Sequence, residues 1–139
     1  MLKIFKVPAF MFIIFGGFIS PSALAETPAD VLASIQTEAS GTPGFKDFSA
    51  ARGQGFFNSK HGNEWSCASC HSENPVASGK HAKTGIPIAP FAPSANAERF
   101  TNPKKVDKWF KRNCNDVLGR ACTAQEKGDL LAYILTVKK

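Results

Sequence analysis

Two cysteines three residues apart, with a histidine directly after the second, constrain this chain more than any other feature. Residues 67–71 read Cys-Ala-Ser-Cys-His. A C-x-x-C-H segment is the attachment signal for a c-type haem. Two thiols at this spacing can each add to a vinyl group on one edge of the porphyrin, and the adjacent imidazole can then bind the iron. The segment therefore predicts one covalent haem c, bonded by Cys67 and Cys70 and ligated by His71.

Paired cysteines also serve two other chemistries. A four-cysteine zinc site would need Cys114 and Cys122 as its second pair, but these are eight residues apart, which is wider than zinc knuckles use. A thioredoxin-like redox dithiol would require a βαβ pattern, and the sequence does not have one. The adjacent His71 favours haem over both alternatives.

The first 25 residues are typical of an export signal. Lys3 and Lys6 precede an apolar stretch over 7–19, and Ala23-Leu24-Ala25 is a small-x-small cleavage site. The apolar stretch is shorter than the about 20 residues that span a bilayer, which disfavours a retained membrane anchor. We expect cleavage after Ala25, export to the periplasm and no membrane span in the remaining domain over 26–139, whose formal charge falls from +6 to +4 with the two lysines.

The rest of the chain predicts an all-α domain with long loops. Helical periodicity and capping residues indicate helices over 28–40, 48–59, 103–113 and 124–137, of which the first is an N-terminal extension. Residues 70–102, by contrast, have little periodicity and much Gly, Pro, Ser and Asn. Because so long an irregular stretch is unusual in a small domain, we expect a large buried cofactor to fill its middle.

Cys114 and Cys122 would lie at the end of the third predicted helix and just before the fourth. Exported thiols need a partner or a ligand, because the compartment is oxidising. A disulfide between these two cysteines would close a short loop and stabilise the fold by about 2.5 kcal/mol. We interpret such a bond as a structural staple, with a redox-responsive disulfide as the alternative.

The sixth iron position has no methionine to fill it, because Met1 and Met11 both leave with the export signal. His61 and His81 lie in polar, turn-rich segments, and we expect both to be exposed. The open candidates are His61, His81, a lysine, Asn113, and an open site that holds water.

Asn113 differs from the other candidates because it shares a helical face with Val106 and Trp109. A polar amide on an apolar face needs a partner if it is buried. A helix C-cap is the structural alternative, since Asn is common where helices end.

The same predicted helix carries a run of cations, mostly away from the face of Asn113. They are Lys104, Lys105, Lys108, Lys111 and Arg112. A solvated helix surface is one interpretation, and a docking patch for an acidic redox partner is the other. Export argues against nucleic acid as the partner.

Several segments resemble the sphaeroides haem protein family, which consists of small periplasmic class I c-type cytochromes with a high-spin haem. They are residues 89–96, 99–101, 108–110, 112–115 and 119–127, together with the haem motif. The resemblance implies a class I cytochrome c fold, with helices wrapped around one haem c. It also implies that Asn113 ligates ferric iron, that Cys114 and Cys122 form a disulfide, and that Trp109 lies against the haem.

In that family, reduction detaches the Asn ligand. The resemblance therefore implies a five-coordinate ferrous haem that can take O2, NO or CO. It further implies a di-haem cytochrome c and a membrane cytochrome b as redox partners. Class I packing would place Gly53 at a helix crossing, with Phe57 against Tyr133, and a carbonyl within 85–93 could accept a hydrogen bond from His71.

Three functions remain open from the sequence. The first is a periplasmic electron carrier whose haem also binds diatomic gases. The second is an enzyme or sensor for oxygen or nitric oxide at the same haem. Enzymatic activity is therefore uncertain, and the sequence favours an electron carrier. The third is a low-spin carrier with two histidine ligands.

Overall fold

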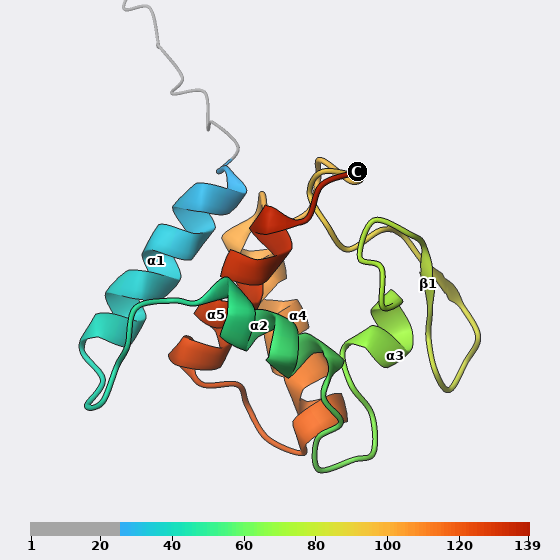
Figure 1. Cartoon of the computed structure of the whole chain (residues 1–139), viewed down its shortest axis with the longest axis horizontal. Helices are drawn as coiled ribbons and strands as arrows, with labels where there is room; N and C mark the ends of the chain where they lie inside the picture. The colour runs from blue at the N-terminus through green and yellow to red at the C-terminus, as the bar shows by residue number, and fades with distance from the viewer. Residues whose placement is uncertain (1–25) are drawn as a thin grey trace, which may run out of the picture.

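Five helices and one short hairpin form the part of the chain that the computed structural model describes, residues 26–139 (Figure 1). The expected export signal over 1–25 lies outside the described residues. The helices are α1 (Pro28–Ser40), α2 (Ala50–Asn58), α3 (Ala68–His71), α4 (Pro103–Leu118) and α5 (Ala124–Thr136). Strands β1 (Gly79–Lys80) and β2 (Pro87–Ile88) pair antiparallel, with Gly79 opposite Ile88. The domain is therefore all-α apart from this hairpin.

Side-chain caps determine where the long helices begin. The hydroxyls of Thr27 and Thr123 each accept a hydrogen bond from the third helical N–H, and the carboxylate of that third residue accepts one from the backbone N–H of the threonine. These capping boxes satisfy N–H groups that have no partner within the helix, which explains why the helices begin there. Both predicted helix starts are confirmed. The second helix begins at Ala50 rather than residue 48, since Ser49 is its N-cap.

The predicted end of the third helix at Asn113 is wrong. Helix α4 continues to Leu118 and ends at Gly119, which adopts a left-handed conformation with φ of 73°. Val117 is buried and extends the apolar face past Asn113. Asn113 is therefore not a C-cap, and Cys114 lies within the helix rather than at its end.

Helices α2 and α5 cross closely at Gly53. A Cβ atom at Gly53 would collide with the carbonyl oxygen of Asp129 and come within 2.9 Å of the Cβ of Tyr133. Phe57 is fully buried, and its ring centroid lies 5.7 Å from that of Tyr133. The predicted crossing and the predicted aromatic contact are both confirmed.

Asp129 links these two helices by hydrogen bonds as well. Its carboxylate accepts from the backbone N–H of Ser49 at 2.7 Å, from the guanidinium of Arg52 at 2.8 and 2.9 Å, and from Gln125 at 3.1 Å. Only 5% of Asp129 is exposed. A buried carboxylate with this many donors is satisfied, so it joins α2 to α5.

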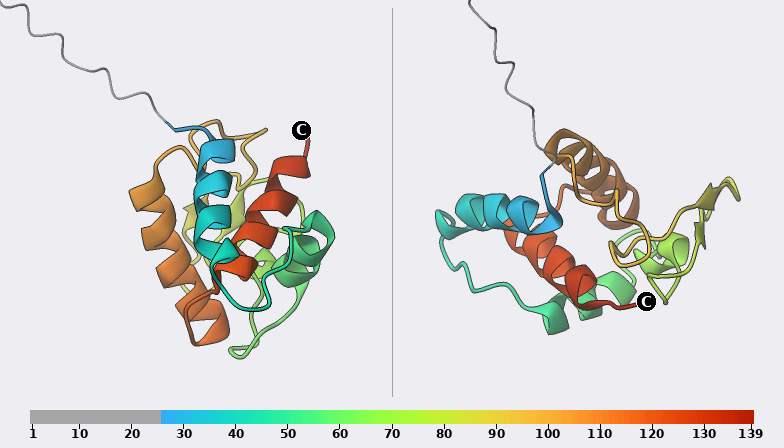
Figure 2. Two further views of the ribbon diagram at one scale, coloured as in Figure 1. Left: turned by 90° about the vertical axis from the view of Figure 1, so that its left-hand side faces the viewer. Right: turned by 90° about the horizontal axis from the view of Figure 1, so that it is seen from above.

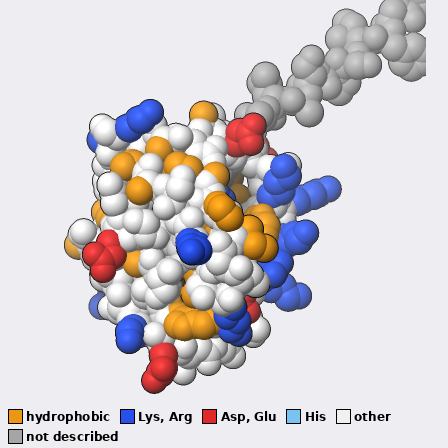
Figure 3. All heavy atoms as spheres, turned by 90° about the vertical axis from the view of Figure 1, so that its right-hand side faces the viewer, with side chains coloured by type: hydrophobic (Ala, Val, Ile, Leu, Met, Phe, Trp, Pro, Cys, Tyr) orange, Lys and Arg blue, Asp and Glu red, His pale blue; other side chains and the backbone are white. Residues whose placement is uncertain are grey.

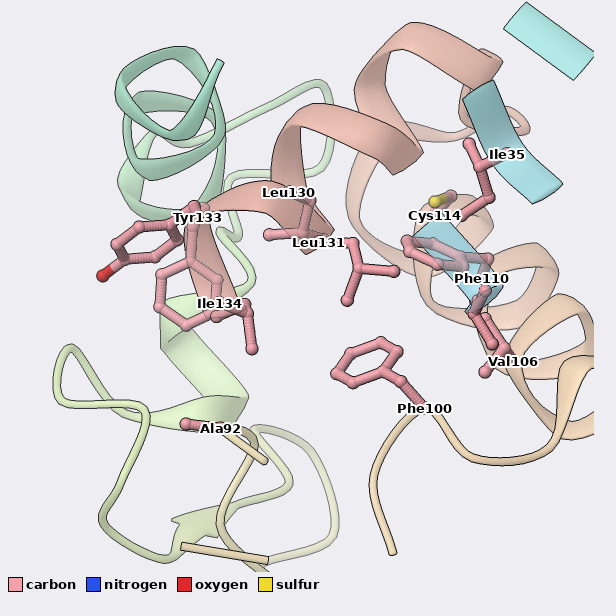
Figure 4. Packing of buried hydrophobic residues seen from close by; sticks show 12 residues of the cluster. Ile35, Ala92, Phe100, Val106, Phe110, Cys114, Leu130, Leu131, Tyr133 and Ile134 are labelled. Carbon is pink, nitrogen blue, oxygen red and sulfur yellow. The ribbon is translucent and has the colours of Figure 1, made fainter. Parts of the chain in front are cut away.

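Helix α1 covers the far side of α5. Its buried stripe is Val31, Ile35 and Ala39. Side chains from α1, α4 and α5 meet in one core, where Ile35, Phe110 and Leu131 are neighbours (Figure 4).

The segment from Ser72 to Asn102 contains only the hairpin as regular structure. Figures 1 and 2 show α1 on one side of the molecule and α3 with the hairpin on the other, with α2, α4 and α5 between them. Among residues 26–139, no helix is long and apolar enough to cross a membrane.

Candidate functional site

The two cysteines and the histidine of the C-x-x-C-H segment lie on one helical turn. The N–H groups of Cys70 and His71 both donate to the carbonyl of Cys67, at 3.2 and 3.0 Å. Ser66 and Ser69 cap this turn reciprocally, since each hydroxyl accepts from the other residue's N–H at 3.1 and 3.0 Å. One short turn thus presents both thiols and the imidazole together.

This turn faces a cavity of about 1380 Å³, which Cys67, Cys70 and His71 all line. Helix α4 and the irregular segment supply most of the remaining wall, with Leu130 of α5, Phe56 of α2 and Trp65. Its apolar lining includes Phe91, Phe100, Val106, Phe110 and Leu130. Because ordinary ligand pockets hold about 300–1,000 Å³, this cavity is large enough for a porphyrin. The irregular segment over 72–102 lines much of the cavity, and Ala92 and Phe100 within it also belong to the hydrophobic core.

His71 is largely buried and held in its neutral form. Burial, and then the nearby charge of Arg99, lowers its pKa to about 4. The imidazole stacks on the ring of Phe91, with the ring centroids 4.3 Å apart. Neutral imidazole is the form that binds a metal, so His71 is suited to ligate iron.

The expected carbonyl acceptor for His71 is not found within residues 26–139, where its buried Nδ1 has no hydrogen-bond partner. The carbonyls of Ala89 and Pro90, in the segment expected to supply the acceptor, instead accept from Arg99 at 2.7 and 2.9 Å. Within residues 26–139 the predicted hydrogen bond is therefore not formed.

The two alternatives to haem lose support from the geometry. Burial raises the pKa of the Cys67 thiol to about 11, whereas a reactive dithiol needs a lowered thiol pKa. In the described part of the chain, no group of three or more His, Cys, Asp and Glu side chains could hold a metal ion. Cys114 and Cys122 are bonded to each other, with an S–S distance of 1.98 Å and a Cα–Cα distance of 5.6 Å.

Asn113 is half-buried on α4 and lines the same cavity as His71. Its neighbour Cys114 is only 4% exposed, and the disulfide ties this part of α4 to the start of α5. Trp109 also lines the cavity but is 47% exposed, and the guanidinium carbon of Arg112 lies 5.6 Å from its ring centroid.

The two other histidines are half-buried, so their expected exposure is wrong. His61 does not line the cavity; it packs on Phe56, which does, and its Nε2 lies 2.9 Å from the carbonyl of that residue. His81 does line the cavity, and its Nδ1 accepts from the N–H groups of Lys83 and Thr84. His81 is therefore the one histidine besides His71 that the described residues bring to the cavity.

Sequence reasoning missed Phe91 and Arg99 as site residues. Both lie in the irregular segment, where no periodicity marks an inward face. The only available signal was the resemblance over 89–96 and 99–101, which gave neither residue a role.

Comparisons with known proteins agree on one family. The model of the family described as "Domain of unknown function (DUF1924)" matches residues 43–134. The chain is 41% identical over 133 residues to Cytochrome c'' of Methylophilus methylotrophus, covering 91% of this chain and 92% of that protein. It is 40% identical over 129 residues to Cytochrome c-type protein SHP of Cereibacter sphaeroides, covering 88% and 95%.

Solved structures of the same two proteins are similar in fold. The structure of oxidized SHP, an oxygen-binding cytochrome c, has a TM-score of 0.68 at 41% identity and covers 78% of this chain and 96% of that chain. The crystal structure of oxidized cytochrome c'' from Methylophilus methylotrophus has a TM-score of 0.72 at 38% identity and covers 81% and 95%. The expected fold and the expected haem c are thereby confirmed. This chain belongs to the DUF1924 family and to the sphaeroides haem protein family of c-type cytochromes, with one covalent haem c.

Proposed function

We propose that this protein is a periplasmic mono-haem electron carrier whose Asn113 ligand detaches on reduction, so that O2, NO or CO can bind. One observation carries the proposal: Asn113 lines the same cavity as the C-x-x-C-H turn, in a domain over 26–139 without methionine. Two relatives support it. SHP is described as an oxygen-binding cytochrome c, and a solution structure of cytochrome c'' concerns haem-ligand detachment.

The residues of the attachment turn fit a haem. Cys67 and Cys70 would form the thioether bonds and His71 would donate its Nε2 to the iron, while the unpartnered Nδ1 keeps the proton. When bound, the haem supplies one-electron redox chemistry and an iron that takes diatomic ligands. Phe91 and Phe100 would supply apolar contacts to the haem from the irregular segment.

Whether Asn113 binds the iron would depend on the oxidation state of the iron. An amide oxygen is a hard, neutral and weak donor, which suits ferric iron better than ferrous iron. Helix α4 continues for more than a turn past Asn113, and Cys114 is anchored by the disulfide. Release therefore needs only a rotation of the Asn113 side chain rather than movement of the helix.

The proposed redox partners are a di-haem cytochrome c and a membrane cytochrome b. The five cations of α4 are all exposed, and none of them makes an ion pair within residues 26–139. Figure 3 shows Lys and Arg side chains gathered along one edge of a face that also exposes apolar side chains. This uncompensated charge supports docking of an acidic protein. Export and cleavage after Ala25 would place such docking in the periplasm.

Absorption spectra of the purified holoprotein test the proposal. We expect a high-spin ferric form and a ferrous form that binds added CO. Asn113→Ala should leave water as the ferric ligand and change the ferric spectrum. Asn115→Ala is the matched control, because Asn115 is exposed on the same helix and does not line the cavity. An unchanged ferric spectrum in Asn113→Ala would remove Asn113 from the iron.

One observation favours a second candidate, a low-spin carrier with two histidine ligands: His81 lines the cavity. That carrier would be low-spin in both oxidation states and would not bind CO. His81→Ala would then convert it to a high-spin form, whereas our proposal expects little spectral change in His81→Ala. Catalytic consumption of O2 or NO with a reductant would instead indicate an enzyme.

A further inference from the structure

Asn63 joins the segment before the haem-attachment turn to the end of α4. Its side-chain amide donates to the carbonyl of Asp116 at 3.0 Å and, with a longer bond, to that of Asn115 at 3.4 Å. Its backbone N–H donates to the carbonyl of Val117 at 3.3 Å. The last carbonyls of a helix have no partner within the helix, so Asn63 supplies donors where α4 needs them.

The loop around Asn63 has a local geometry that brings it close to α4. The N–H of His61 donates to the carbonyl of Trp65, and the N–H of Glu64 donates to the carbonyl of His61, both at 3.1 Å. Glu64 adopts a positive φ of 60°, which completes the tight turn. A Cβ atom at Gly62 would lie only 3.2 Å from the carbonyl oxygen of Leu118. The loop is therefore folded on itself and rests on the end of the helix.

This contact connects the two chain segments that carry the proposed iron ligands. The attachment turn begins three residues after Asn63, and Asn113 lies about one helical turn before the carbonyls that Asn63 binds. Within residues 26–139, every hydrogen bond between 59–71 and α4 is made by Asn63. The disulfide instead joins α4 to the segment just before α5. Asn63 is thus the direct polar link between the His71 segment and the Asn113 helix.

We propose that Asn63 is a positioning residue for Asn113, which holds the end of α4 to the attachment segment and so strengthens Asn113 ligation of ferric iron. The inference rests on the proposed ligation by Asn113. A weak ligand depends strongly on being held near its metal, because its own bond has to offset the entropy of ordering it. Release by rotation of the side chain alone also requires that α4 stays fixed, and Asn63 provides that restraint.

Asn63→Ala in the holoprotein tests this role, because it removes the side-chain amide and keeps the backbone N–H. We expect the equilibrium constant for Asn113 ligation to fall about tenfold, as for other groups that orient a metal ligand. The ferric absorption spectrum should then move toward that of Asn113→Ala. Because Asn113 binds only the ferric form, weaker ligation should raise the midpoint potential, by up to about 59 mV for that tenfold change in a one-electron couple.

The same substitution in the Asn113→Ala protein separates positioning from a general effect on the fold. With no ligand left to position, Asn63→Ala should leave the midpoint potential of that protein unchanged, so the two substitutions are not additive. Asn63→Gln keeps an amide donor and should restore part of the ligation. Asn58→Ala is the matched control, since Asn58 is also exposed and its amide donates to the carbonyl of Gln54, within α2. It should change neither the spectrum nor the potential.

The outcomes distinguish this inference from the proposed function. If Asn113→Ala changes the ferric spectrum but Asn63→Ala changes neither the spectrum nor the potential, only the role of Asn63 is overturned. Equal shifts of the potential with and without Asn113 would also overturn it. If Asn113→Ala leaves the ferric spectrum unchanged, both proposals fail.

Asn63→Ser decides if Asn63→Ala does not accumulate. Its hydroxyl is one atom shorter than the amide and cannot span the same distance to Asp116. An unchanged potential and ferric spectrum in Asn63→Ser would overturn the proposal.

Discussion

Two regions of the molecule differ in what surrounds their aromatic rings. One is the crossing of α2 and α5, and the other is the segment over 72–102. At the crossing, Phe57 is fully buried against Tyr133, and the carboxylate of Asp129 is satisfied by four donated hydrogen bonds. Around the cavity, Phe91 stacks on an imidazole whose Nδ1 has no partner in the described chain. The first region is completed by protein atoms. The second presents an apolar wall and polar groups that the haem must complete.

The strongest way to break this comparison is to prevent haem attachment with Cys67→Ser and Cys70→Ser together. We expect loss of the visible spectrum and loss of amide exchange protection over 72–102, while α2 and α5 stay protected. The loss of stability should exceed about 4 kcal/mol, the stabilisation that a ligand gives at 1,000 times its Kd. Hydrogen-exchange mass spectrometry measures both regions in one experiment. Equal loss of protection in the two regions would contradict the distinction.

Gly53→Ala perturbs the helix crossing instead of the haem cavity. The added methyl group would meet the backbone of Asp129, which cannot rotate away, so the helices must separate. We expect the free energy of unfolding to fall by about 3 kcal/mol or more. Chemical denaturation of the holoprotein measures the change.

Gly55→Ala is the matched control for that substitution. Gly55 lies in the same helix, and nothing is within 4 Å of its missing Cβ. Alanine has the higher helix propensity, so this variant should gain about 0.5–1 kcal/mol. A similar loss of stability in both variants would show that any alanine in α2 destabilises the protein, whether or not it lies at the contact with α5.

The same division explains what the sequence could predict. Helices α1 and α5 begin where Thr27 and Thr123 predict, because a cap is a local interaction between residues three apart. The sequence predicts the end of α4 too early, because Asn is a residue type common at helix ends and Asn113 stands where such an end is expected. The apolar positions beyond it and Gly119 carry the helix on to Leu118.

The sequence predicts only those residues of the candidate site that are close together in the chain. The C-x-x-C-H turn carries its own chemistry in five adjacent residues. The position of Arg99 depends on the path of the chain around the cavity, which brings its guanidinium to the carbonyls of Ala89 and Pro90. No hydrophobic period encodes that path, because the surface being covered belongs to the haem.

The Cys114–Cys122 disulfide connects the cavity wall to the helical core, so its removal sharpens the comparison. Replacing both cysteines with alanine should lower the free energy of unfolding by about 2.5 kcal/mol, since the closed loop is short. We expect the ferric spectrum to persist, because the backbone hydrogen bonds of α4 extend past Asn113 to Leu118. Thermal unfolding and absorption spectra of the same sample measure the two effects. A changed ferric spectrum with α4 intact would instead favour a redox-responsive bond.

The smallest effect on stability is expected on the exposed face of α4, which belongs to neither region. Lys108→Gln with Lys111→Gln should change the free energy of unfolding by less than about 0.5 kcal/mol, because both side chains are exposed and neither forms an ion pair within residues 26–139. The rate of electron transfer from an acidic di-haem cytochrome c should nevertheless fall several-fold at low salt. Stopped-flow mixing at two ionic strengths measures it, and the difference should disappear at high salt, where screening removes the attraction. Equal rates at low salt would mean that these cations form only a solvated surface.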